Sequence, residues 1–597
     1  MQKLRRRVWV GLAGVLAITL SGVVLRSRLR SGREARRSDA APLASVAGSR
    51  RYAKPLVSLK DVGVGDDEFV DDAPDSADQP IDDFKPRSDL PAWDLKLPLD
   101  WSADPFDDVN WRAQLHMLRM IDGALARHEK THDPGSYREA LAVVLDWWRY
   151  HQEAKAVPSL VWNAMTAGVR AARLAYVLDR AFSGKAKLAP SEEAALLAMA
   201  EAHVVRLRDP ESLARSNHGL FQMRGLMLLC RVLGNSGACK GGDAYVEMAV
   251  RELLDQQFTA DGVHREHSPG YHVLAIDAFE AFAQPAGSGV FRELAERLEQ
   301  ARAATPWFVF PDGRLALLGD TEGDAPTTPP PHQRCAAGAP PTCAEVAQLS
   351  RSGYAIVRSP WSEDAQRAFM LIMTSSYNSG AHKHADDLSF ELMDGGQMLF
   401  VDAGKYSYQG DSMRRFVRSV RAHNTVGLET AEIDPIHGTK HASGLEPTEE
   451  ADGVYTLRGQ VEHPTMFSQT RRVDYAPGRF LRISDELRGD SQQTYQSYLH
   501  LPPKLKPTAE GTGFMVPLKD GRTVRIESLS HDCVASKARG RRNRRQTQGW
   551  VTQGYRHMIP ASALTFTCAG RNRNITLLVS FDDAGRKAGI LAGSRGR

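Results

Sequence analysis

Two histidines stand two residues apart in the stretch SGAHKHADD, residues 379–387, beside several other titratable groups. His382 and His384 flank Lys383, and Asp386 and Asp387 follow directly. This spacing allows one imidazole to bind a metal ion while its neighbour transfers a proton. A solvated loop that is polar by chance is the alternative, and the stretch alone does not decide between the two.

Two further polar stretches interrupt apolar sequence. In RSNHGLFQ, Asn217 and His218 precede an apolar helical pattern, so Asn217 as a simple helix N-cap is the plainer interpretation. In HREHSPGYH, residues 264–272, the side chains of Glu266, His267 and Tyr271 surround a Ser-Pro-Gly turn, which is also typical of a polar turn before a helix. Imidazole and phenol groups can nevertheless act as general acids and bases.

A third polar region extends from residue 382 to the stretch RSVRAHNTV. Asp402 ends the apolar pattern QMLFVD, and a carboxylate buried in a strand needs a partner. The residues that could partner it are His382, His384, Tyr406, Tyr408, Arg414, Arg418 and His423.

The elements that must position these residues change type along the chain. Between about Leu97 and Ala344 the apolar spacing is helical: one stripe runs from Trp111 through Leu115, Leu118 and Ile121 to Leu125, and further helices are predicted near 160–183, 191–207, 218–233, 243–257, 271–284 and 291–305. From about Gly353 the sequence predicts strands: AIVRS, AFMLIMTSS, LSFELMDGGQMLFVDAG with an Asp394-Gly395 turn, GVYTLRGQV, RFLRISDEL, YQSYLHL and ITLLVSF.

Helices in series favour a toroid or bundle, and strands without intervening helices favour an antiparallel sandwich. We therefore predict an α+β multidomain protein with an (α/α) toroid over residues 96–345 and a β-sandwich over residues 346–597. Residues 31–95 are charged and rich in Ser, Asp, Pro and Ala, so we expect a disordered linker there.

The N-terminus, residues 1–30, contains an uncharged apolar run from Val8 to Leu25 between basic flanks. The run is long enough to span a bilayer as a helix, and the arginines after it (Arg26, Arg28 and Arg30) disfavour cleavage there. We expect a membrane anchor that leaves the bulk of the chain on the periplasmic side of a bacterial envelope. A cleaved signal peptide, which would give a secreted protein, is the alternative.

The six cysteines pair by proximity as Cys230 with Cys239, Cys335 with Cys343, and Cys533 with Cys568. Six cysteines allow fifteen pairings, so spacing alone does not prove these. Disulfides would fit an oxidising compartment, and free buried thiols are the alternative.

Composition is ordinary for a globular chain of 597 residues, with 42% apolar and 25% charged residues and a net charge of +4. That balance says little about partners, and we expect no nucleic acid among them. The basic run from Lys537 to Arg545 reads as a solvated loop, with an anionic partner as the alternative. The oligomeric state stays open.

As an ordered set, the stretches SNHGLFQ, EHSPGYH, HKHADDLSFEL, LFVDAGKYSYQGD and RSVRAHNTV resemble the heparinase II/III-like polysaccharide lyases, which include oligoalginate lyases. The resemblance covers roughly residues 95–590. It implies a toroid followed by a sandwich, with the active cleft between them. It also implies one zinc ion, mainly structural, at the positions of His384, Asp402 and His423, and catalytic groups at Asn217, Tyr271 and His382 with His218 close by.

Those groups suit β-elimination of a uronic-acid polysaccharide. Asn217, helped by His218, would neutralise the uronate carboxylate, Tyr271 would protonate the leaving oxygen, and His382 would remove the C5 proton for one C5 epimer. For the other epimer Tyr271 would serve as base too. If HKH were a strand, His382 and His384 would share one face. The expected substrate contacts are Glu266, His267, Tyr406, Arg414 and Arg418.

Two other function classes remain open at this stage. An inverting glycoside hydrolase needs two opposed carboxylates, for which Glu266 and Asp386 are conceivable. A non-catalytic polysaccharide-binding or envelope-assembly protein is the other. The sequence does not distinguish heparin-like, alginate or exopolysaccharide substrates, nor endo from exo cleavage.

Overall fold

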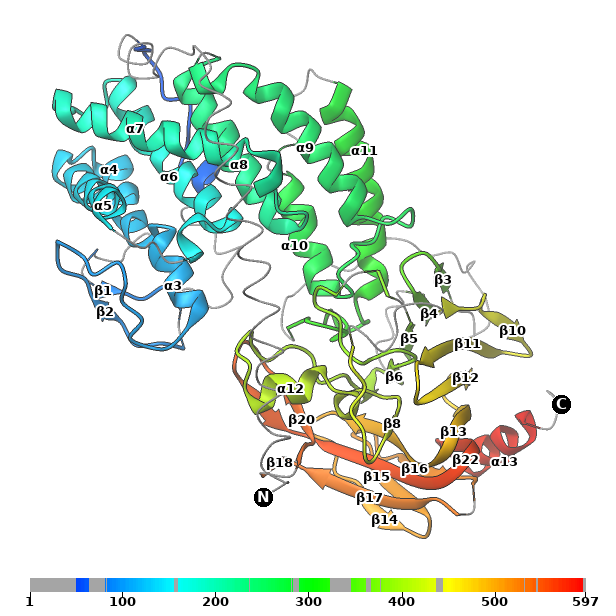
Figure 1. Ribbon diagram of the computed structural model, residues 1–597. Helices are drawn as coiled ribbons and strands as arrows, with labels where there is room; N and C mark the ends of the chain where they lie inside the picture. The colour runs from blue at the N-terminus through cyan, green and yellow to red at the C-terminus, as the bar shows by residue number, and fades with distance from the viewer. Residues whose placement is uncertain are drawn as a thin grey trace, which may run out of the picture.

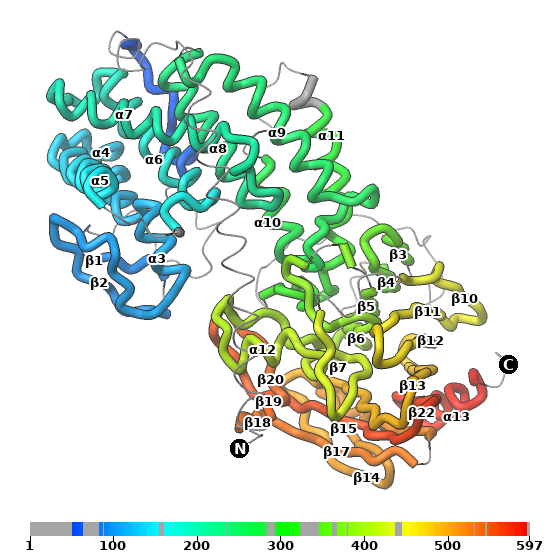
Figure 2. Tube along the Cα trace, in the orientation of Figure 1, coloured from blue at the N-terminus to red at the C-terminus, as the bar shows by residue number. Residues whose placement is uncertain are grey.

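The computed structural model describes residues 50–63, 81, 83–87, 89–154, 159–235, 237–280, 282, 289–322, 345–360, 367–375, 377–378, 380–435, 444–530, 532–543 and 546–593. The chain forms a helical domain first and a β-rich domain second, and it passes once from one to the other (Figures 1 and 2). The predicted order of helices followed by strands is therefore confirmed.

The helical domain contains α3 (Val109–His116), α4 (Asp122–Thr131), α5 (Pro134–Glu153), α6 (Ala164–Phe182), α7 (Pro190–Leu207), α8 (Asn217–Leu233), α9 (Gly242–Gln257), α10 (Pro269–Glu280) and α11 (Gly289–Ala304). Side-chain caps set several of the starts: Asp133 caps α5, Asn163 caps α6 and Ser216 caps α8, each by accepting backbone N–H groups. The buried faces of these helices share one apolar core.

The apolar stripe from Trp111 to Leu125 is not one helix. Helix α3 ends at His116, Leu118 adopts a left-handed φ of 62°, and α4 starts at Asp122. Every residue of the stripe is still buried, so burial imposed the spacing while the chain turned between two helices.

Helices α6 and α8 pack through glycine. A Cβ on Gly168 would lie 2.3 Å from the backbone oxygen of Phe221, and one on Gly225 would lie 2.3 Å from that of Gly168. Only residues without a side chain allow this approach. The close contact fixes α8, and with it Asn217 and His218 at its N-terminus.

One sheet of the β domain is a five-stranded meander in the order β3-β4-β5-β6-β7. Its strands are β3 (Glu345–Leu349), β4 (Tyr354–Arg358), β5 (Met370–Thr374), β6 (Phe390–Asp394) and β7 (Gln397–Phe400). The β6–β7 hairpin turns at Gly395 and Gly396, with φ of 58° and 68°, one residue later than the predicted Asp394-Gly395 turn.

The second sheet has the main order β10-β11-β12-β13-β22-β16-β15-β14, with β17 paired to β22, β8 to β13 and β9 to β11. Its strands are β8 (Val426–Leu428), β9 (Gly444–Leu445), β10 (Glu449–Ala451), β11 (Val454–His463), β12 (Phe467–Ala476), β13 (Phe480–Leu501), β14 (Thr508–Glu510), β15 (Gly513–Pro517), β16 (Thr523–Ser528), β17 (Val534–Arg539) and β22 (Ser562–Ser580). The predicted strands RFLRISDEL and YQSYLHL are both parts of β13, whose pairing with β22 shifts register between Arg488 and Gln493.

Small pairs complete the fold: β1 (Asp83–Phe84) with β2 (Trp93–Asp94), β18 (Arg541–Arg542) with β19 (Thr547–Gln548), and β20 (Trp550–Thr552) with β21 (Met558–Pro560). Two short helices, α12 (Ser412–Arg418) and α13 (Asp583–Ala592), lie within the β domain. The basic run from Lys537 is therefore partly strand, in β17 and β18, rather than the predicted loop.

Both faces of the five-stranded sheet are covered. Leu371 and Met373 of β5 join a core shared with the eleven-stranded sheet, whereas Met370 and Ile372 pack with residues of the 305–318 segment. This explains why MLIMT has no polar alternation. The same packing holds the 305–318 segment against the sheet, and the segment leads directly to Asp320.

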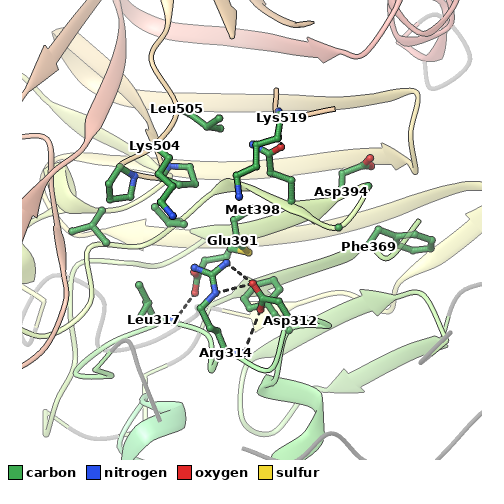
Figure 3. Close-up of a pocket in the computed structure, with 18 of the residues that line it drawn as sticks. Asp312, Arg314, Leu317, Phe369, Glu391, Asp394, Met398, Lys504, Leu505 and Lys519 are labelled. Carbon is green, nitrogen blue, oxygen red and sulfur yellow. Dashed lines mark hydrogen bonds and ion pairs between the residues drawn. The ribbon is translucent and has the colours of Figure 1, made fainter. Parts of the chain in front are cut away.

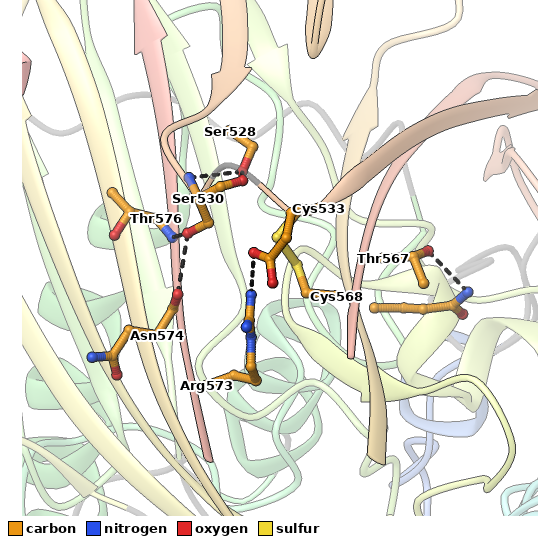
Figure 4. The surroundings of a disulfide bond; sticks show 10 residues. Ser528, Ser530, Cys533, Thr567, Cys568, Arg573, Asn574 and Thr576 are labelled. Carbon is orange, nitrogen blue, oxygen red and sulfur yellow. Dashed lines mark hydrogen bonds and ion pairs between the residues drawn. A yellow bond between two sulfur atoms is a disulfide. The ribbon is translucent and has the colours of Figure 1, made fainter. Parts of the chain in front are cut away.

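Two predicted disulfides are confirmed, Cys230–Cys239 and Cys533–Cys568. The second joins the residue before β17 to its partner strand β22 (Figure 4). Cys335 and Cys343 lie outside the described residues.

The expected disordered linker, residues 31–95, is partly folded. Val57, Val62 and Phe84 are buried in the core of the helical domain, and the backbone N–H of Leu56 donates to Asp179 at 2.8 Å. Burial of these apolar side chains stabilises the segment, although many of the residues around them are polar or charged. Among the described residues no helix is long and apolar enough to cross a membrane, and the run Val8–Leu25 lies outside them.

Candidate active site

His382 lies on a loop of the β domain between two carboxylates. Its Nδ1 is 2.8 Å from Oδ2 of Asp320, and its Nε2 is 3.3 Å from Oε2 of Glu266. An ionised carboxylate only accepts hydrogen bonds, so Asp320 assigns the proton of a neutral ring to Nδ1. The lone pair of Nε2 is then available on the other side of the ring, as a general base requires.

The HKH stretch is not a strand. His382 has a left-handed φ of 55°, and residues 381–389 form turns and loop. His382 and His384 still reach a common partner, because His384 Nε2 lies 2.8 Å from Oδ1 of Asp320. A non-glycine residue keeps a strained φ only where the surrounding structure holds it, and such residues cluster at active sites and ligand-binding sites.

Asp320 is the residue that organises the site, and our sequence analysis missed it. It is 2% exposed and accepts hydrogen bonds from His382, His384 and Arg414. Burial alone would raise the pKa of Asp320, but these donors hold it well below its usual range. Its sequence context, the end of LALLGD, carries no signal of three partners 62 to 94 residues away.

The loop that carries Asp320 passes through a narrow gap. Gly319 has a φ of 57°, and a Cβ there would lie 2.3 Å from the backbone oxygen of His267 and 3.2 Å from that of His382. Thr321 accepts hydrogen bonds from the backbone of Gly270 at 3.1 Å and contacts Ser268 at 2.9 Å. The loop thus joins the start of α10 to the His382 loop.

Tyr271 stands in the first turn of α10 and stacks on His382. The ring centroids are 3.6 Å apart and the planes differ by 20°. The backbone N–H of Tyr271 donates to Ser268 Oγ, which starts the helix. The predicted acid and the predicted base, 111 residues apart in sequence, are therefore in contact.

Asn217 and His218 form the first turn of α8, and this helix packs against α10. Ser216, not Asn217, is the N-cap, so Asn217 is not required for capping. Burial, followed by the charge of His382, lowers the pKa of His218, which places the two imidazoles in one electrostatic environment. A helix N-terminus also favours a bound carboxylate.

His384, Asp402 and His423 gather at a buried point of the β domain. Each offers one ligand atom, and these atoms lie within 4.8 Å of one another. The ring nitrogens Nδ1 of His384 and Nε2 of His423 are buried without a hydrogen-bond partner among the described residues, whereas Asp402 accepts from Nδ1 of His423 at 2.7 Å. Two imidazoles and a carboxylate fit a zinc ion, and Asp320 on Nε2 of His384 supplies the outer hydrogen bond typical of such ligands.

Lys383 has a structural role. Its Nζ lies 2.5 Å from Asp386 and 3.0 Å from Asp387, and all three side chains are buried. Although burial by itself lowers the pKa of Lys383, the two carboxylates raise it to about 12. The titratable groups of HKHADD thus comprise a buried ion-pair cluster and the two candidate site histidines, His382 and His384.

Lys405 was not predicted as a site residue, yet it lies beside Tyr271. Its Nζ pairs with Glu322 at 2.6 Å and lies 5.8 Å from the Tyr271 ring centroid, 4.8 Å from that of Tyr408 and 5.4 Å from that of Tyr555. Lys405 is 3% exposed. An ammonium among aromatic faces adds positive potential to the site.

The predicted substrate contacts divide into two groups. Glu266 and Arg414 lie at the site, although Arg414 is bound to Asp320. Arg418 lies close enough for Arg414 and Asp320 to influence its pKa, which burial lowers, and its Nε has no hydrogen-bond partner within the described part of the chain.

The other two predicted contacts do not face the site. His267 is buried and accepts from the N–H of Asn378 at 3.0 Å, so it holds a loop instead. Tyr406 packs against Ala403, Met413 and Phe416, and its neighbour Tyr408 takes the place beside His382, with ring centroids 6.3 Å apart. The substrate contact of Tyr406 stays a prediction; the backbone here is loop, without regular alternation, so the sequence did not indicate that Tyr408 lies beside His382.

Contacts between the domains flank the site on two sides. Ser352 of the β domain donates to Asp261 at 2.9 Å, and Arg87 lies 4.5 Å from the ring centroid of Tyr555. Arg556 reaches Asp108 at 3.8 Å. The site therefore combines residues that are in contact only while the two domains stay docked.

Comparison with known proteins agrees with this arrangement. The family model "Heparinase II/III N-terminus" matches residues 57–326, and "Heparinase II/III-like, C-terminal" matches residues 342–581. The chain belongs to the heparinase II/III-like family. A heparin-sulfate lyase of Pedobacter heparinus is 22% identical over 532 residues, which is 84% of this chain and 78% of the relative. A heparin-sulfate lyase of Bacteroides stercoris is 22% identical over 228 residues, so the match spans 36% of this chain and only 31% of that relative.

Solved structures of the family have the same fold. A crystal structure of heparinase III matches with a TM-score of 0.69 at 15% identity, covering 91% of this chain and 87% of that chain. The heparan sulfate lyase HepC of Pedobacter heparinus matches with a TM-score of 0.56 at 17% identity, covering 90% and 87%. A helical N-terminal domain followed by a β-rich C-terminal domain is thus the fold of this chain too.

Proposed function

We propose that this protein cleaves a uronic-acid-containing polysaccharide by β-elimination and leaves an unsaturated uronate at the new end. Within the heparinase II/III-like family, it is a polysaccharide lyase enzyme. The observation that carries the reaction type is the stack of Tyr271 on His382, whose two ring nitrogens lie 2.8 Å from Asp320 and 3.3 Å from Glu266.

The proposed reaction begins with the uronate carboxylate. The amide of Asn217 and the N-terminal turn of α8 would hold it and stabilise the negative charge that builds up as C5 loses its proton. Nε2 of His382 would take that proton, with Asp320 stabilising the imidazolium. Tyr271 would donate its hydroxyl proton to the departing O4 oxygen, and for the other C5 epimer it would act as base as well.

The two carboxylates of a hydrolase are not available in this geometry. Asp386 is 1% exposed and bound to Lys383, so it cannot activate water opposite Glu266. Glu266 and Asp320 both contact His382, and carboxylates beside a histidine base suit proton transfer better than glycoside hydrolysis.

We propose one zinc ion at His384, Asp402 and His423. When bound, it would act mainly as a structural tie, cross-linking the His384 loop to the segments that carry Asp402 and His423. His384 would also hold Asp320 in place through Nε2. The residues of this chain, not the ion, carry the proton transfers in the proposed reaction.

The finer architecture is part of the proposal. The helices α3–α11 would form an (α/α) toroid and the two large sheets a sandwich, with the substrate cleft between the two domains. Arg418 offers positive charge for carboxylate or sulfate groups. Two relatives are named heparin-sulfate lyases, which favours a heparan-sulfate-like polymer as substrate. Alginate and bacterial exopolysaccharides are the further candidates.

We further propose that residues 8–25 anchor the enzyme in a bacterial envelope with the two domains on the periplasmic side. Fractionation of cells should find the full chain in the membrane fraction. Recovery of a shortened chain in the medium would favour a cleaved signal peptide instead.

The decisive assay is digestion of heparan sulfate, heparin, alginate and glucuronate-containing exopolysaccharides by the purified chain. A lyase raises ultraviolet absorbance in step with new reducing ends, because the C4–C5 double bond is conjugated to the carboxylate. Reducing ends without absorbance would identify a hydrolase. Binding without either product would identify a non-catalytic protein, and both outcomes would reject the proposal.

A further inference from the structure

A large groove of the β domain lies apart from Asn217, Tyr271 and His382. Its volume is about 1410 Å³, and it is bordered by residues 310–317, the β6–β7 hairpin and the segments around 502–505, 519–522 and 551–559. A typical small-molecule pocket measures roughly 300–1,000 Å³, so this groove has room for a chain of several sugar rings. We call it the basic groove, after the side chains described next.

Cations reach into the basic groove from facing sides. Lys504 and Lys519 project from one side, and Arg314 stands on the opposite side (Figure 3). Arg314 is paired with Asp312, and Arg522 is paired with Asp520 at 2.7 Å. Among the described residues, neither Lys504 nor Lys519 has a carboxylate within ion-pair distance, so two positive charges in the groove are not neutralised by the protein.

The two buried carboxylates of the groove already have partners. Glu391 accepts from the backbone N–H of Leu317 at 2.6 Å, and Asp394 accepts from the hydroxyl of Tyr475 at 2.7 Å. They line the wall below the lysines without forming an ion pair with them. The groove therefore favours an anionic ligand.

The remaining lining indicates the kind of anion. Half-buried apolar side chains, Pro477, Pro502, Pro503 and Ile559, lie in the same groove and suit the C–H faces of sugar rings. Its aromatic side chains, Phe310 and Phe369, are buried and cannot stack on nucleotide bases. The described residues that line the groove include no histidine and no tyrosine, so they lack the proton-transfer groups found around Tyr271.

We propose that the basic groove is a second, non-catalytic binding site for an acidic oligosaccharide, in which Lys504 and Lys519 hold its carboxylate or sulfate groups. The inference rests on the proposed function, because the natural ligand would be another stretch of the polymer that the enzyme cleaves. A second binding site would keep the polymer bound to the enzyme between cleavages and so raise the effective concentration of the polymer at the active site.

Calorimetric titration tests the groove on the full chain carrying Tyr271→Phe, which spares the ligand from cleavage. The probes are a heparan sulfate octasaccharide and an oligomannuronate octasaccharide, titrated at about 0.15 M ionic strength to screen non-specific attraction. The sulfated and the carboxylate-only probe show which anionic group the site prefers. The groove variant is Lys504→Ala/Lys519→Ala, and Lys506→Ala/Lys587→Ala is the control, with the same loss of charge at exposed residues outside the groove.

We expect one binding event to weaken by about tenfold or more in the groove variant and to stay unchanged in the control. Equal affinities and stoichiometries in the two variants, or no binding of either probe, would overturn the proposal. The lyase proposal is tested separately by ultraviolet absorbance. A groove-dependent binding event without any cleavage by the parent protein would reject the lyase chemistry and leave the second site standing.

Discussion

The ring of Tyr271 lies on the imidazole of His382, with centroids 3.6 Å apart and planes inclined by 20°. Tyr271 belongs to α10 of the helical domain, whereas His382 belongs to a loop of the β domain. The contact therefore exists only where the two domains meet. In the proposed reaction, this places the acid, Tyr271, beside the base, His382, so that both can act on one sugar. For the other C5 epimer, Tyr271 would act as both acid and base.

The first prediction concerns the hydroxyl of Tyr271. Tyr271→Phe retains the stacked ring but removes the proton that the leaving oxygen needs, so kcat should fall by roughly 10²–10⁴-fold on every cleaved polymer. Initial rates of absorbance increase measure this. Tyr150→Phe, a hydroxyl lost from α5 outside the site, should keep parental rates. Near-normal turnover of the Tyr271→Phe enzyme would refute the proposed role.

The second prediction concerns Asp320 as a positioning residue. Asp320→Asn preserves the size of the side chain but removes the carboxylate that holds the proton of His382 on Nδ1. On polymers that need His382 as base, kcat should therefore fall by about 10²–10⁴-fold, with little change in KM. The pH profile separates this role from a merely structural one. Because His382 must be neutral to act as base, loss of the carboxylate should move the acidic limb of kcat toward lower pH, since the imidazolium loses its counter-ion.

Asp490→Asn, at an exposed position of β13 outside the site and the basic groove, is the matched control for Asp320→Asn and should leave the profile unchanged. An Asp320→Asn enzyme with parental kcat and pH profile would mean that His382 needs no orientation by this carboxylate.

The third prediction concerns metal content. Protein purified without a histidine tag should contain about one zinc per chain by elemental analysis, and His384→Ala should contain much less. The variant should also melt at a lower temperature, since a ligand of the native state adds stability. His557→Ala removes an exposed imidazole and serves as the control. Equal zinc in His384→Ala and the parent would place the metal elsewhere.

The fourth prediction concerns acid stability. Burial by itself would raise the pKa of Asp386, but the ammonium of Lys383 lowers it to about 2, compared with 3.8 when unfolded. Because the folded pKa is the lower one, the carboxylate stabilises the fold above pH 3.8 and loses that contribution as the pH falls toward 2. The difference corresponds to roughly 2 kcal/mol of unfolding free energy.

Denaturant unfolding of the parent and of Asp386→Asn tests the effect. At neutral pH the variant should be about 3 kcal/mol less stable, since Lys383 loses one of two buried partners. Between pH 4 and pH 2 its stability should fall less steeply than that of the parent. Asp490→Asn, at an exposed position of β13, should follow the parent, and parallel curves for Asp386→Asn would show that the pair does not titrate as described.

Much of the fold was determined by the sequence itself. Helical spacing of apolar residues predicted α6 to α9 closely, and apolar runs predicted β4 to β7, β11, β13 and part of β22, because burial of one face sets these periods. The other strands of the two sheets were not predicted. Two of the three proximal cysteine pairs were also confirmed. Local spacing did not predict the break at Leu118 or the union of two predicted strands in β13, since tertiary packing and long-range pairing decide where an element ends.

The site divides in the same way. The sequence determined which residue types were present: the imidazoles, the phenol of Tyr271 and the carboxylate Asp402 stood out by their chemistry. Only the tertiary structure decided that Asp320 binds His382, His384 and Arg414 and that Lys383 forms an internal ion pair. It also decided that Lys405 lies beside Tyr271 and that Tyr408 lies beside His382. Those contacts join loops from both domains, and loop backbones have no period from which the direction of a side chain can be inferred.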